Sequence, residues 1–95
     1  MRRYRLTGPA RADLRDVWKA LAHRSEARAD RFLDELVIRF QEIADQPRPR
    51  GSKDIMFDSN CRIHTICEFV IFYRPQDDGI EIIRIQEGPD DHRFW

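Results

Sequence analysis

The feature that most constrains the fold is a change in the spacing of apolar residues along the chain. From residue 8 to residue 45, apolar residues recur at intervals of three and four, the spacing of an amphipathic helix. From residue 61 to residue 85, they alternate with polar residues or form short continuous runs, which is typical of strands. The chain therefore places helices before most of its sheet, which predicts an α+β fold.

Two helices are expected in the first half. Thr7 is a suitable N-cap before Gly8 and Pro9, so the first helix is predicted over residues 8–22. Ser25 can cap a second helix, which should end near Asp45 because prolines follow in QPRPRG. The short junction between the helices predicts an antiparallel hairpin.

Strands are expected on both sides of this hairpin. A short segment at 4–6 precedes it, and segments at 61–66, 69–73 and 80–85 follow, with a turn at 75–79. Strict alternation places Ile80, Ile82 and Arg84 on one face of the last strand. The predicted order is an N-terminal strand, an antiparallel helical hairpin and a three-stranded antiparallel sheet, within a single domain over residues 1–95.

Charge and composition exclude several classes of protein. The chain has 17 basic and 17 acidic residues, so it lacks the positive field that drives non-specific binding to nucleic acid or anionic membrane. It has neither a membrane-length apolar run nor the apolar centre of a signal peptide, so a cytoplasmic location is expected. Cys61 and Cys67 fit neither a disulfide framework nor a zinc site, and no metal or cofactor is expected.

The sequence permits a catalytic hypothesis. If Arg62 and Arg84 share the sheet face away from the helices, they could join Lys53 of the preceding loop and His92 of the tail. Such a set could stabilise a phosphorane and transfer a proton in metal-independent RNA cleavage. The alternative is that the arginines pair with acidic neighbours or contact a partner, and the many nearby acidic residues favour that alternative.

The sequence resembles the ParE branch of the ParE/RelE toxin superfamily over nearly its whole length. The matching stretches are ADLRDVW in the first helix, ADRFLDEL in the second, the proline and glycine loop, and VIFYRPQDDGIEIIRI. The sequence departs from the family where Cys67 and Glu68 replace a usual glycine, which predicts a different hairpin there. It departs again at Glu87 and Asp90, where ParE-like sequences often have His and Arg.

The resemblance implies the toxin of a bacterial type II toxin–antitoxin pair. A ParD-like antitoxin would bind it in a hetero-oligomer, and the free toxin would inhibit DNA gyrase by protein contacts, without catalysis, specific DNA binding or membrane association. The alternatives are a RelE-like ribosome-dependent endoribonuclease, since Arg62 and Arg84 lie where RelE-type toxins carry catalytic arginines, and a module with a decayed target site. The antitoxin is expected to bind Trp18, Leu21, Arg62, Phe69, Ile82 and Arg84, and the target to bind the tail, with Gly88, Asp91, His92, Arg93, Phe94 and Trp95.

Overall fold

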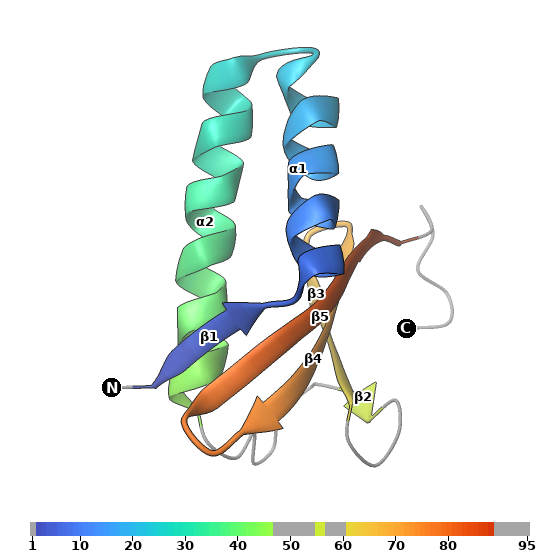
Figure 1. Ribbon diagram of the computed structural model, residues 1–95. Coiled ribbons are helices and arrows are strands. Elements are labelled where there is room, and N and C mark those ends of the chain that lie inside the picture. Colours follow the sequence, from blue (N-terminus) through green and yellow to red (C-terminus); the bar gives the residue numbers. More distant parts are fainter. Residues whose placement is uncertain (1, 47–54, 57–60, 89–95) are drawn as a thin grey trace.

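The computed structural model describes residues 2–46, 55–56 and 61–88. The elements along the chain are β1 (Arg3–Leu6), α1 (Gly8–Ala22), α2 (Glu26–Asp45), β2 (Ile55–Met56), β3 (Arg62–Ile66), β4 (Phe69–Gln76) and β5 (Gly79–Glu87). Figure 1 shows the two helices side by side as a hairpin that extends beyond the sheet. The predicted α+β class and the order of its elements are confirmed.

Both helices begin at the residues that the sequence indicated. The Thr7 hydroxyl accepts a hydrogen bond from the Ala10 N–H at 3.1 Å, and the Ser25 hydroxyl accepts one from the Arg28 N–H at 3.2 Å. Each cap satisfies a backbone donor that the first turn of a helix leaves without a partner. Local side chains thus define where the hairpin starts and where it turns.

The five strands form one sheet in the order β1-β5-β4-β3-β2. β1 is parallel to β5 and pairs only with its first half, from Gly79 to Ile82, while the other neighbours are antiparallel. Beyond Ile82, the outer edge of β5 faces the start of α1 instead of a strand. There, the Thr7 N–H donates to the Ile82 carbonyl at 3.0 Å, and the Thr7 hydroxyl donates to the Ile83 carbonyl at 2.8 Å.

The core lies between the helical hairpin and one face of the sheet. Leu36, Phe40, Ile71 and Ile82 have no exposed surface and form the centre of this cluster. Tyr4 packs against Phe40 with ring centroids 5.6 Å apart, which attaches β1 to α2. The apolar stripes predicted for the two helices therefore meet the sheet as a continuous core.

A bulge in β5 overturns the predicted alternation of its side chains. Tyr73 lies opposite Ile82, but the neighbouring Phe72 lies opposite Arg84, so Ile83 is an extra residue in β5. An extra residue shifts the alternation by one position. The assignment of Arg84 to the same face as Ile82 is therefore wrong.

Ile85 takes the core position that strict alternation assigned to Arg84. Ile80, Ile82 and Ile85 are all buried in the core cluster, whereas Arg84 is exposed. The bulge thus places an arginine at the open edge of β5, within reach of α1.

Two residues at the tight turns of the sheet, one within a turn and one directly after a turn, have positive φ. Cys67, between β3 and β4, has a φ of 54°, a backbone region where glycine is favoured. Gly79 follows the β4–β5 turn with a φ of 148°. A Cβ atom there would lie 1.7 Å from the Arg3 carbonyl oxygen, so this glycine permits β1 to approach.

Within the described residues, no helix is both long and apolar enough to cross a membrane. Cys61 is buried and Cys67 is exposed, and the two form no disulfide. In the same part of the chain, His, Cys, Asp and Glu side chains form no group of three or more that could hold a metal ion.

Candidate functional site

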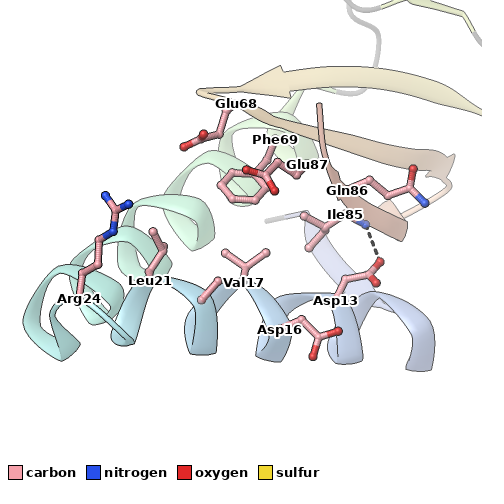
Figure 2. Close-up of a pocket in the computed structure, with 11 residues that line it drawn as sticks. Asp13, Asp16, Val17, Leu21, Arg24, Glu68, Phe69, Ile85, Gln86 and Glu87 are labelled. Atoms are coloured by element: carbon pink, nitrogen blue, oxygen red, sulfur yellow. Dashed lines mark hydrogen bonds between the residues drawn. The ribbon is translucent and has the colours of Figure 1, made fainter. Parts of the chain in front are cut away.

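An open groove of about 540 Å³ lies between α1 and the unpaired half of β5. We call it the α1–β5 groove, and Figure 2 shows the side chains that line it. The β3–β4 turn and the first residue of β4 close one side of it. Its lining residues are Asp13, Asp16, Val17, Ala20, Leu21, Arg24, Glu68, Phe69, Ile85, Gln86 and Glu87.

The floor of the α1–β5 groove is apolar. Val17, Phe69 and Ile85 are 8%, 7% and 3% exposed, and half-buried Leu21 packs against the same cluster. In Figure 2, these side chains point toward one another from the helix and the strands. Because the sheet and the helix hold them in place, the floor is a preformed apolar surface for a partner.

The rim of the groove is acidic. Asp16, Glu68 and Glu87 are exposed there, and Arg24 is the single basic residue in the lining. A fourth acid, Asp13, is neutralised by an ion pair with Arg84. An apolar floor with a negative rim favours a partner segment whose apolar residues are flanked by Lys or Arg.

Asp13 attaches α1 to β5 at one end of this groove. Its Oδ2 accepts hydrogen bonds from Arg84 Nε at 2.7 Å and from the Ile85 N–H at 2.8 Å, and its Oδ1 accepts one from Arg84 Nη2 at 3.1 Å. The Ile85 bond, drawn dashed in Figure 2, satisfies a backbone donor on the open edge of the strand. Asp13 is 14% exposed, so it is partly shielded from water.

Opposing effects set the pKa of Asp13. Burial alone would raise it, but the hydrogen bonds from Arg84 and Ile85 and the charge of Arg84 together hold the pKa of this carboxyl below its usual range. The same contact raises the pKa of Arg84. Because the folded pKa of Asp13 lies below the unfolded value, the ionised carboxylate stabilises the fold above the unfolded pKa.

We predict that Asp13→Asn lowers the free energy of unfolding by about 1–3 kcal/mol at neutral pH, since it removes hydrogen bonds to a charged group. Asp13 stabilises the native state above about pH 4, near its unfolded pKa, and that contribution disappears as pH falls through the lower folded pKa. The stability difference between the parent and the variant should therefore shrink in acid. Urea unfolding of both proteins across this range measures it, and a difference independent of pH would contradict the assignment.

The sequence pattern described as "ParE toxin of type II toxin-antitoxin system, parDE" matches residues 4–91. The chain belongs to the ParE toxin family. A comparison with curated proteins found no match. In a comparison with solved structures, the chain is similar to one from "Chromosomal ParDE TA system from P. aeruginosa", with a TM-score of 0.69 and 22% identity over 94% of this chain and 98% of that chain. This likeness supports the ParE-type fold of the sheet and hairpin.

The structure brings two of the predicted antitoxin-binding residues together. Leu21 and Phe69 both line the floor of the α1–β5 groove of this ParE-family chain. Trp18 lies on the other flank of α1, where its indole Nε1 donates a hydrogen bond to Asp30 at 2.8 Å. Ile82 is 0% exposed in the core, so it offers no surface to a partner in this structure.

The expected shared face of Arg62 and Arg84 is wrong. Arg62 lies opposite Tyr73, and Arg84 lies opposite its neighbour Phe72. Residues directly opposite each other share a face, and neighbours along a strand point to opposite faces, so the two arginines lie on different sides of the sheet. Arg84 is also engaged by Asp13.

Of the other residues predicted for catalysis or target binding, the structure describes only Gly88. Lys53 and His92 lie outside the described residues, as do Asp91, Arg93, Phe94 and Trp95. Gly88 is described, and its N–H donates to the Glu68 carbonyl at 2.7 Å. The described part of this ParE-family chain therefore assembles none of the proposed catalytic set.

Most residues of the α1–β5 groove were not predicted from the sequence. Asp13 and Asp16 stand three residues apart on α1, a spacing that places them on one flank of a helix. This spacing is visible in the sequence. The strand edge that the two acids face is far away along the chain, so nearby residues do not indicate it. Strict alternation assigned Ile85 to the other side of the last strand, although the adjacent Ile82 and Ile83 interrupt the alternation at the position of the bulge.

Proposed function

We propose that this ParE-family chain is a toxin that a ParD-like antitoxin neutralises by placing an amphipathic segment in the α1–β5 groove. The observation that carries the proposal is the apolar floor beneath an acidic rim in a protein of this family. The segment is expected to be a helix with apolar residues on one face and Lys or Arg beside them, since this pattern matches the groove in both polarity and charge.

The geometry of the groove supports such a segment. The floor from Val17 to Leu21 covers about one helical turn, with Phe69 and Ile85 on the facing sheet. A flexible antitoxin segment would lose conformational freedom on docking, and burial of its apolar side chains against this floor offsets that cost. Acidic residues at the rim would attract the basic flanks and set the orientation.

We further propose that the free toxin inhibits DNA gyrase through protein contacts and without chemistry of its own. Family membership supports this target. The separation of Arg62 and Arg84 on opposite faces of the sheet also removes the arginine pair on which the ribonuclease alternative was built. Binding to gyrase would stabilise the state in which the enzyme holds cleaved DNA.

A gyrase assay tests this target. Purified gyrase, supercoiled plasmid and ATP are mixed with increasing amounts of the chain, and linear DNA is scored after proteinase treatment. Linear DNA should accumulate with the folded chain and should not accumulate with heat-denatured chain or when gyrase is omitted. Intact plasmid at every concentration of folded chain would reject gyrase as the target, while antitoxin binding at the groove would remain separately testable.

A further inference from the structure

The outer edge of β5 has two halves with different neighbours. β1 pairs with the first half, from Gly79 to Ile82. At the bulge, the Thr7 N–H bonds to the Ile82 carbonyl and the Thr7 hydroxyl bonds to the Ile83 carbonyl. Beyond Ile83, no strand among the described residues pairs with this edge. The second half of β5 therefore has an open edge, and α1 lies beside it.

The backbone groups of Ile85 and Glu87 point toward this open edge. The Ile85 N–H bonds to Asp13 of α1, and the Gly88 N–H bonds to the Glu68 carbonyl on the other side of β5. Along an antiparallel strand, alternate residues turn both their N–H and their C=O group to the same side. Glu87 therefore points the same way as Ile85. In the part of the chain that the structure describes, the Ile85 carbonyl and both backbone groups of Glu87 have no hydrogen-bond partner.

An open edge of this kind can pair with the same edge of a second copy of the chain. Antiparallel pairing centred on Gln86 would place Ile85 of each copy opposite Glu87 of the other, so their outward N–H and C=O groups would bond to one another. This pairing is isologous, because the same residues contribute on both sides. Exposed Gln86 would face its own counterpart, and the β-branched isoleucines of the segment favour an extended backbone.

Asp13 blocks this pairing at one backbone group. Its Oδ2 accepts the Ile85 N–H at 2.8 Å, and Figure 2 shows this bond dashed between α1 and the strand. An added strand would need the same N–H for one of its carbonyl oxygens. Bonds from Arg84 at 2.7 and 3.1 Å hold the carboxylate in place. A fixed negative charge at this position also repels the partial negative charge of an approaching carbonyl oxygen.

We propose that Asp13 keeps the open edge of β5 from pairing with a second copy of the chain. Arg84 is a positioning residue, since it holds the carboxylate against the strand edge without covering that edge itself. Natural sheets protect exposed edges with charged side chains or with a covering helix, and this chain uses a charge carried by a helix. The inference depends neither on gyrase inhibition nor on the antitoxin segment proposed for the α1–β5 groove.

Two substitutions of Asp13 separate the bond to the strand edge from the ion pair. Asp13→Ala removes the acceptor, whereas Asp13→Asn loses the negative charge but keeps an amide oxygen that can accept the Ile85 N–H. Analytical ultracentrifugation of the full chain should show at least about tenfold stronger dimerisation of Asp13→Ala than of the parent. Asp13→Asn should stay within about threefold of the parent, and so should Asp16→Ala, which removes an exposed acid one turn along α1.

Glu87→Pro identifies the edge through which the dimer forms. The Glu87 N–H points away from β4, so proline leaves the β4–β5 ladder intact and removes one donor of the open edge. The double variant Asp13→Ala/Glu87→Pro should return to the monomer–dimer equilibrium of the parent. Arg84→Ala, at an exposed position, releases the carboxylate and should strengthen dimerisation about threefold.

Circular dichroism establishes which variants are folded. The proposal is overturned if folded Asp13→Ala dimerises no more than the parent, or if Asp13→Asn dimerises as strongly as Asp13→Ala. A dimer that persists in the double variant would place the contact on another surface and would also reject the open edge. If Asp13→Ala does not fold, an Arg84→Ala protein that dimerises no more than the parent overturns the proposal.

Discussion

Replacing Leu21 with lysine should weaken antitoxin binding at least 100-fold while leaving the chain toxic. Leu21 is the half-buried member of the groove floor, so its change affects the docking surface more than the core. The variant removes apolar contact area and places a charge against the apolar residues of the proposed partner. A loss of 100-fold corresponds to about 2.7 kcal/mol, within the range of an interface hot spot.

Cell growth separates loss of docking from loss of folding. Expression of Leu21→Lys should stop growth as the parent does, and co-expression of the antitoxin should no longer restore it. Leu21→Met keeps the apolar character and nearly the same volume, so it should still be rescued. If the antitoxin neutralises Leu21→Lys as well as the parent, with equal amounts of folded protein, the α1–β5 groove is not the antitoxin site.

Replacing Gly79 with valine should destabilise the fold by about 3 kcal/mol or more. The Cβ atom would lie 1.7 Å from the Arg3 carbonyl oxygen, and the φ of 148° is itself unfavourable for a β-branched residue. Relief requires β1 to move away from β5. Since the Arg3 N–H also bonds to the Asp78 carbonyl at 2.7 Å, the parallel pairing of the N-terminal strand would be lost.

Gly8→Ala is the matched control for this substitution. A Cβ atom at Gly8 would meet nothing within 4 Å, and alanine favours the helical backbone, so its stability should equal or slightly exceed that of the parent. Urea unfolding followed by circular dichroism measures both variants. A Gly79→Val protein within about 0.5 kcal/mol of the parent would show that the close approach of β1 is not required for stability.

The bounds of the two helices were predicted well because the residues that start and end each helix lie within or next to it in the sequence. The first helix was predicted over 8–22 and is Gly8–Ala22, and the second was expected to end near Asp45, where it does end. Thr7 and Ser25 cap backbone donors only three residues away, so the sequence carries the full signal. β1, β4 and β5 were predicted too short, since pairing with a neighbour extends β4, for example, as far as Gln76, whereas β3 begins at Arg62, one residue later than predicted.

The candidate site was predicted only in part. Leu21 and Phe69 were identified as interface residues, but the acids around them were not, and Ile82 proved to be core. The prediction that Arg62 and Arg84 share a face was wrong because it assumed strict alternation of side chains along β5, which contains a β-bulge. A bulge arises from pairing with β4 and with the cap of α1, and neither partner is visible in the six residues of IEIIRI.

The sequence by itself determined the order, type and boundaries of the helices, the strand segments and the membership in the ParE toxin family. Each of these depends on side chains within a few positions of one another or on a pattern of residues along the chain. Only the tertiary structure decided that Asp13 holds Arg84, 71 positions away, and that α1 and the unpaired half of β5 enclose a groove with an acidic rim. Those features depend on where the hairpin meets the open edge of β5, which is set by packing of the whole domain rather than by any one segment.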